Sequence, residues 1–175
     1  LPGDDLLVSR KPTGTLLISD LHPGRNLYLL ATGTGLAPFL GVLKDPEVYE
    51  RFERVILTHG VREAKDLAYR DYIERELPRH EHLGELISKQ LLYYPAVSRE
   101  PFRNHGRLTD LMASGRMQAD LGIEPLDASR DRAMICGSPQ MLADFRSLLD
   151  SRGFQAAPRI GSPGEYVFER AFVEK

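Results

Sequence analysis

Short apolar runs and stretches of helical periodicity alternate along this chain. Five runs have the length and composition of strands, and the first four look buried on both faces; they cover 26–31 (NLYLLA), 54–60 (RVILTHG), 89–95 (KQLLYYP), 132–137 (RAMICG) and 165–170 (EYVFER). Between them, apolar residues recur three or four positions apart, which predicts helices over 36–43, 66–77, 108–113 and 139–149. The alternation predicts an α/β fold with a five-stranded parallel sheet flanked by helices and joined by right-handed crossovers.

Two segments fall outside this alternation. Residues 6–18 consist of short alternating apolar pieces around RKPTG, which predicts a β-type segment with a turn at 12–14. Residues 117–131 (MQADLGIEPLDASRD) form the longest irregular connection. The chain starts at Leu1 with no segment resembling a signal peptide, so we expect it to be part of a longer protein.

Composition narrows the classes of function. The chain has 175 residues, of which 42% are hydrophobic and 27% charged, with a net charge of −2. These values are typical of a globular domain and argue against a general nucleic-acid or anionic-membrane binder. The apolar runs are too short to span a bilayer, and a single cysteine, Cys136, permits no internal disulfide. We therefore expect a cytoplasmic protein. Separately, we expect it to be a monomer.

The loops that follow the strands are the candidate binding regions, because ligands of parallel sheets collect at the carboxyl ends of the strands. In the first loop, TGTGLAP, Gly33 and Gly35 separate a strand from a helix, where free amides favour a phosphate. The third glycine of a dinucleotide fingerprint is replaced by Pro38, which suits a first helical turn. A phosphate-binding turn and a purely structural turn both fit these residues.

Arginines gather in two of the other loops. Ser98, Arg99, Arg103 and Arg107 crowd one loop, and Arg62 follows the preceding strand. Guanidinium groups and hydroxyls match the oxygens of a phosphomonoester. Each arginine taken singly fits a solvated surface loop, but their shared position at one edge of the sheet favours phosphate binding.

Cys136 ends a predicted buried strand, and its thiol has two interpretations. It fits a nucleophile, but no histidine lies nearby in sequence, so an inert buried cysteine is favoured. The five histidines show no metal-ligand spacing beyond one exposed-looking pair, His80 and His82. We expect no metal site.

In order, these motifs resemble the nicotinamide-binding half of bacterial ferredoxin (or flavodoxin) NADP reductases. The similarity covers nearly the whole chain and runs through GDDLLVSRKPTGTL, LLATGTGLAPFLGVL, HGVREAKDLAYRD, VSREPF, HGRLTDL, MICGSPQML and YVFERAFVEK. It implies that residues 1–20 are the end of an FAD-binding β-barrel and residues 21–175 an NADP(H)-binding domain. The Arg-x-Tyr-Ser motif that holds FAD in that family does not occur in these 175 residues.

The resemblance also assigns roles to individual residues. It implies that Gly33, Thr34 and Gly35, followed by Pro38, approach the dinucleotides, with Thr34 placed to contact FAD. It implies that the adenosine ribose and its 2′-phosphate are held by Arg62, Ser98, Arg99 and Arg107. It also implies that the CGS segment, Cys136, Gly137 and Ser138, lies beside the nicotinamide. Phe172 would cover the flavin ring, and Lys175 would join the cofactor-binding residues.

The function implied is electron transfer between NADPH and ferredoxin or flavodoxin through FAD, with this chain lacking most of the FAD domain and inactive alone. Two alternatives stay open: an NAD(P)H-binding reductase component of an oxygenase, and a non-catalytic nucleotide-binding module. From the residues themselves, arginines in place of an acidic ribose ligand favour NADP over NAD. Glu63, which follows Arg62, is the one acidic residue in the HGVRE loop, and we expect its side chain to point away from the ribose.

Overall fold

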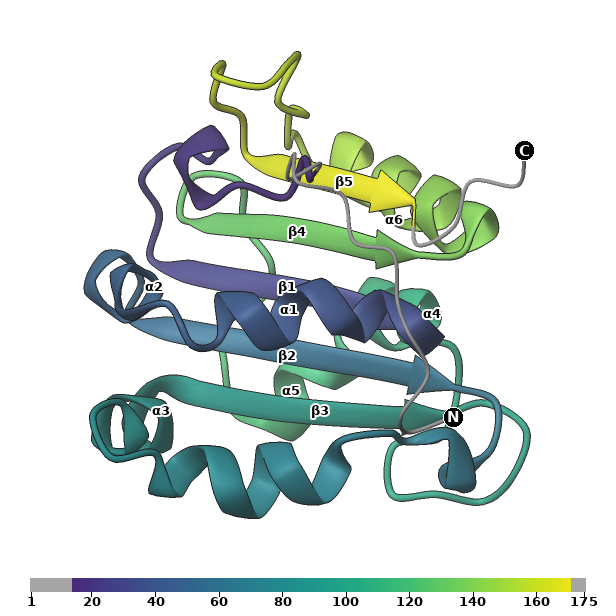
Figure 1. The fold of residues 1–175 in the computed structure, drawn as a ribbon. Helices are drawn as coiled ribbons and strands as arrows, with labels where there is room; N and C mark the ends of the chain where they lie inside the picture. The colour runs from purple at the N-terminus through teal and green to yellow at the C-terminus, as the bar shows by residue number, and fades with distance from the viewer. Residues whose placement is uncertain (1–13, 171–175) are drawn as a thin grey trace, which may run out of the picture.

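A computed structural model describes residues 14–170 of the chain. Its centre is a five-stranded parallel sheet with the order β3-β2-β1-β4-β5 (Figure 1). The strands are β1 (Asn26–Thr32), β2 (Arg54–Val61), β3 (Leu91–Val97), β4 (Asp131–Gly137) and β5 (Tyr166–Arg170). The predicted fold class and all five strands are confirmed.

Helices cover both faces of the sheet (Figure 1). In the described part of the chain the α-helices are α1 (Ala37–Val42), α2 (Pro46–Arg51), α3 (Gly84–Gln90), α4 (Leu108–Ala113), α5 (Arg116–Leu121) and α6 (Pro139–Ser151). Shorter turns of other helical types are η1 (Ile18–Asp20), η2 (Gly33–Leu36), η3 (Ala64–Asp66), η4 (Tyr72–Glu76) and η5 (Leu77–Arg79). Among residues 14–170, no helix is both long and apolar enough to cross a membrane.

The core has one layer on each side of the sheet. Odd-numbered residues of β1, such as Leu27 and Leu29, pack toward α1, α2 and α3. Even-numbered residues, such as Tyr28 and Leu30, pack toward α4, α5 and α6. Because both faces of β1 are covered, the strand is an unbroken apolar run, which is why its position could be predicted.

The helix predicted over 66–77 is wrong as a continuous α-helix. Tyr69 has a φ of +61°, a left-handed conformation that interrupts any helix passing through it. Beyond it lie the π-type turn η4 and the 3-10 turn η5, which contains Pro78. Three short helices, α2, α3 and α5, were not predicted, and α5 occupies part of the connection expected to be irregular.

The β-type segment predicted over 6–18 lies mostly outside the described residues. Its described end is not a strand: residues 14–17 have no regular structure, and η1 begins at Ile18. This end is tied to the α/β domain, because Arg51 donates hydrogen bonds to the carbonyl oxygens of Ile18 (2.9 Å) and Leu21 (3.0 Å). The division at residue 20 stays a prediction.

The strand order places a topological switch at the centre of the sheet. From β1 the chain moves outward through β2 to the edge strand β3, then returns to form β4 on the other side of β1. The loops after β1 and β4 therefore diverge and leave a crevice at the carboxyl ends of these strands, the usual ligand position in open α/β sheets.

Candidate nucleotide-binding site

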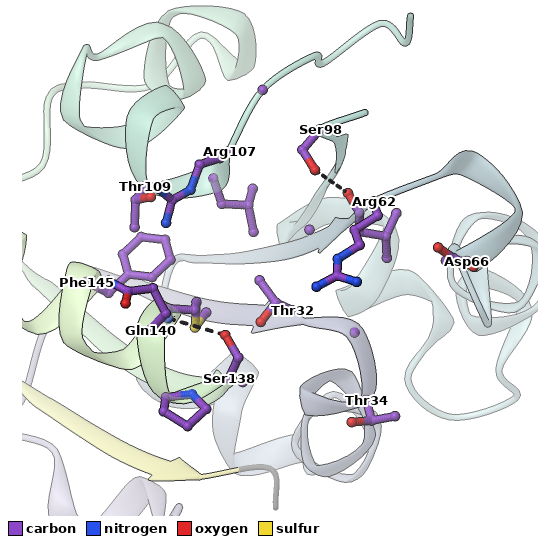
Figure 2. Close-up of a pocket in the computed structure, with 18 of the residues that line it drawn as sticks. Thr32, Thr34, Arg62, Asp66, Ser98, Arg107, Thr109, Ser138, Gln140 and Phe145 are labelled. Atoms are coloured by element: carbon purple, nitrogen blue, oxygen red, sulfur yellow. Dashed lines mark hydrogen bonds between the residues drawn. The ribbon is translucent and has the colours of Figure 1, made fainter. Parts of the chain in front are cut away.

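A pocket of about 780 Å³ occupies this crevice (Figure 2). The loops after β1, β2, β3 and β4 all contribute to it, together with the start of α6 and the end of β5. Seven predicted site residues line it, namely Gly33, Thr34, Arg62, Ser98, Arg107, Gly137 and Ser138. The structure thus brings together side chains and backbone separated by more than a hundred positions in the sequence.

The glycine turn after β1 forms one wall of the pocket. Gly33 and Thr34 are exposed and line it, and Gly33 has a φ of +52°, which favours glycine. Gly35 is buried and is not among the lining residues; a Cβ atom there would collide with the backbone of Cys136 in β4. Close packing of η2 against β4 thus explains Gly35, while Gly33 leaves its part of the pocket wall without a side chain. Pro38 lies in the first turn of α1, outside the lining.

Backbone hydrogen bonds join the loops after β2 and β3. The amide of Ser98 donates to the carbonyl oxygen of Val61 (3.1 Å), and the amide of Arg99 donates to that of Arg62 (3.0 Å). The pairing of β2 with β3 thereby extends past the strand ends and sets Ser98 beside Arg62. Arg62 turns toward the interior of the pocket, whereas Arg99 is exposed and not among the lining residues (Figure 2).

Arg107 reaches the pocket from the residue before α4. Its Nη2 donates to Oδ2 of Asp144 on α6, and the other carboxylate oxygen accepts from Nε2 of Gln140 at 2.7 Å. Asp144 therefore holds two pocket side chains, one of them cationic, at the mouth of the site. Arg103 of the same loop is instead bound to Glu74 at 3.0 Å and does not line the pocket.

The first turn of α6 forms the opposite wall. Ser138 is the N-cap, and its Oγ accepts a hydrogen bond from the amide of Met141 at 3.3 Å. Pro139 occupies the first helical position, which suits its fixed φ. The amino end of this 13-residue helix thus faces the pocket, where its dipole and free amides favour an anion.

Cys136 lies below this wall and outside the pocket lining. The residue is 3% exposed and belongs to the apolar layer under α1. Burial, assisted by the charge of Glu169, raises the pKa of the thiol to about 11. A protonated, buried thiol fits packing and positioning and does not fit nucleophilic attack.

Several pocket residues were not predicted. Thr32, Asp66, Thr109, Gln140, Met141, Phe145 and Arg170 line the pocket with the predicted set. Asp66 alters the expectation of an arginine-dominated site, because it adds a carboxylate to a lining that includes Arg62, Arg107 and Arg170. Glu63, the acidic residue that was considered, is bound to Lys65 at 2.6 Å and is not among the lining residues.

Sequence signals for these residues were weak. Asp66 follows Arg62 by four positions and opens the stretch of helical spacing over 66–77, but this stretch does not form the continuous helix that would fix the direction of Asp66. Arg170 closes a strand that was predicted, and its place at the carboxyl edge was therefore available from the sequence. Phe172 and Lys175, predicted to contact the cofactors, lie outside the described residues.

Comparisons with known proteins cover most of the chain. Residues 29–147 match the family described as "Oxidoreductase NAD-binding domain". The chain is 60% identical to a ferredoxin–NADP reductase of Pseudomonas aeruginosa and 58% identical to one of Azotobacter vinelandii, each over 173 residues. These alignments cover 99% of this chain and 67% of each relative.

Solved structures of reductases share the fold of this chain. A ferredoxin NADP+ reductase from Neisseria gonorrhoeae with bound FAD and NADP superposes with a TM-score of 0.77 at 30% identity, over 91% of this chain and 61% of that one. A cytochrome P450 reductase from Amycolatopsis gives a TM-score of 0.61 at 26% identity, over 92% of this chain and 42% of that one. With the parallel sheet, the glycine turn and the arginine-lined crevice in place, the chain belongs to the ferredoxin–NADP reductase family, of which it carries the oxidoreductase NAD-binding domain.

Proposed function

We propose that this chain is the NADP(H)-binding part of a flavoenzyme that transfers electrons between NADPH and ferredoxin or flavodoxin through FAD. The observation that carries the proposal is the pocket at the switch point, where a glycine turn, the amino end of α6 and three arginines meet. Its volume of about 780 Å³ lies within the range of small-molecule and cofactor sites. The named reductases of the family support the same reading.

The residues present fit NADP(H). Arg62 and Arg107 line one side of the pocket with Ser98, and two guanidinium groups with a hydroxyl suit the oxygens of a 2′-phosphate. Arg99, on the adjoining backbone, adds positive charge at the rim. On the other side, Gly137 and Ser138 would receive the nicotinamide, and Gly33 and Thr34 would approach the dinucleotides.

The chemistry of hydride transfer from nicotinamide to flavin belongs to the two cofactors when they are bound. The protein's own groups bind the nucleotide and align it. The arginines bind the phosphate groups of the nucleotide. Because Gly33 has no side chain, its backbone can approach the nucleotide closely. Cys136 supports the floor of the site through packing, with its thiol protonated at neutral pH.

A reductase component of an oxygenase is the second candidate, favoured by the similarity to the Amycolatopsis cytochrome P450 reductase. Nucleotide preference separates the two, since such components often use NADH whereas the arginines around the pocket favour NADP(H). The free, buried Cys136 suits a reducing compartment, and we place the protein in the cytoplasm. We also propose a monomer.

The test uses the holoenzyme, meaning this chain together with its flavin-binding part. We expect a yellow protein that reduces ferredoxin or flavodoxin with NADPH and binds NADP+ more tightly than NAD+ in calorimetric titrations. A preference for NADH, with transfer to an oxygenase instead, would support the second candidate. Nucleotide binding by a colourless protein without reductase activity would support a non-catalytic module.

A further inference from the structure

His59 is a buried polar residue below the glycine turn. It occupies the carboxyl end of β2, in register with Ala31 of β1, and its residue exposure is 1%. It has the same strand parity as Val55 and Leu57, which belong to the apolar layer under α1. An imidazole in such a layer is costly unless it is hydrogen-bonded.

One hydrogen bond accounts for its position. Nε2 of His59 lies 3.2 Å from the carbonyl oxygen of Gly33. A carbonyl oxygen only accepts, so Nε2 must carry the hydrogen and donate it. Burial lowers the pKa of His59, although the bond to Gly33 partly opposes the shift, and a neutral ring follows. A neutral ring with hydrogen on Nε2 leaves Nδ1 bare, and Nδ1 is buried without a partner within residues 14–170.

This hydrogen bond holds the carbonyl group of Gly33 in the glycine turn. Gly33 has no side chain and a φ of +52°, and no described atom outside residues 32–34 lies within 4 Å of the position that its Cβ would occupy. Side-chain packing therefore does not hold this residue. The imidazole, 26 positions away in sequence, connects its carbonyl group to β2 while the exposed side of the turn faces the pocket.

We propose that His59 is a positioning residue for the nucleotide site, in which Nε2–H holds the carbonyl group of Gly33 and so orients the backbone of Gly33 and Thr34 toward the pocket. The inference rests on the proposed function, in which this turn receives the dinucleotide. His59 does not line the pocket and acts through Gly33. Its effect should therefore be shared by NADP+ and NAD+, in contrast to that of Arg107, which lies with the group proposed to bind the 2′-phosphate.

The first test reads the tautomer directly and needs no nucleotide. Long-range 1H–15N NMR spectra of histidine-labelled holoenzyme at neutral pH, assigned by loss of signals in His59→Gln, report which ring nitrogen of His59 is protonated. We expect hydrogen on Nε2 and a bare Nδ1. Hydrogen on Nδ1 with a bare Nε2, or a doubly protonated ring, would overturn the proposal.

The second test compares three holoenzyme variants by calorimetric titration with NADP+ and NAD+. His59→Gln places an amide donor near the position of Nε2, His59→Asn places it nearer Nδ1, and His59→Leu has none. Loss of a hydrogen bond of this kind corresponds to about a 3- to 10-fold change in affinity. We expect that loss for both nucleotides in His59→Asn and His59→Leu, with His59→Gln within about 2-fold of the parent.

Nucleotide affinities equal to that of the parent in all three variants would overturn the positioning role. An equal loss of affinity in all three, including His59→Gln, would overturn it as well. If His59→Leu does not fold, the comparison of Gln with Asn still decides, because these two variants differ in where the donor lies. Failure of the parent holoenzyme to bind either nucleotide would instead refute the proposed function, while the NMR result would still test the bond between His59 and Gly33.

Discussion

Gly35 lies against the carbonyl group of Cys136, so closely that a Cβ atom on residue 35 would overlap the carbonyl oxygen and approach the amide nitrogen of Gly137 at 2.9 Å. This contact joins the turn after β1 to the end of β4 at the switch point of the sheet. The two glycines of the turn therefore have different roles, since Gly35 permits packing and Gly33 supplies a left-handed backbone.

The first prediction follows from this difference. Gly35→Ala should lower the free energy of unfolding by about 3 kcal/mol, at the upper end of the range for overpacking, because the obstructing atoms are backbone. Gly33→Ala should cost about 1 kcal/mol, because its Cβ meets nothing within 4 Å and only the left-handed φ opposes it. Urea denaturation of both variants measures this, and equal losses would contradict it.

The second prediction concerns the preference for NADP(H). Replacing both Arg99 and Arg107 with alanine should weaken NADP+ binding by about two orders of magnitude, since each charged hydrogen bond contributes about 1.5 to 3 kcal/mol and exposure favours the lower value. NAD+ binding should change little, and the salt dependence of NADP+ affinity should flatten. Arg103→Ala is the matched control, because Arg103 is bound to Glu74 outside the pocket. Equal losses for NAD+ and NADP+ would show that the two arginines only support the loop.

A third prediction separates the two roles of Ser138, which caps α6 and lines the pocket. Ser138→Ala should cost about 1 kcal/mol of stability, because the cap is lost. Ser138→Asp should retain the cap and the stability but weaken NADP+ binding, since its negative charge offsets the dipole and free amides at the amino end of α6 that favour the ligand's diphosphate. Thermal unfolding and calorimetric titration read the two effects, and unchanged binding in Ser138→Asp would place the nucleotide elsewhere.

The fourth prediction is a pH dependence from the buried thiol. In the folded protein the pKa of Cys136 is raised from 9.0 to about 11. Between these values the unfolded chain loses the thiol proton while the folded chain keeps it, so rising pH favours unfolding. The contribution reaches at most about 2 to 3 kcal/mol. Cys136→Ala should lack it, and the stability difference between parent and variant should shrink from pH 9 to pH 11 in urea titrations. A constant difference would contradict the raised pKa.

The fifth prediction concerns catalysis. In the holoenzyme, Cys136→Ala should slow hydride transfer without eliminating it, because a packing group affects alignment and forms no covalent intermediate. Stopped-flow reduction by NADPH measures the rate. Complete loss in a folded, flavin-loaded variant would indicate an obligate chemical role for the thiol.

The sequence alone was sufficient for the sheet and for seven of the residues that line the pocket. Strands covered on both faces appear as unbroken apolar runs, and parallel strands bring their carboxyl ends to one edge. The loops containing Gly33, Arg62, Ser98, Arg107 and Ser138 therefore had to meet there, and the structure places all five around one pocket.

Only the tertiary structure decided how these residues are held. Two contacts join segments that are far apart in the sequence: the hydrogen bond from His59 to Gly33 and the ion pair of Arg107 with Asp144. The position of Asp66 in the pocket likewise follows from no local sequence pattern. Tyr69, with its positive φ, likewise divides a stretch whose spacing was helical. Periodicity records which face of an element is buried, whereas pairing between elements depends on strand register and close packing, and these exist only once the chain has folded.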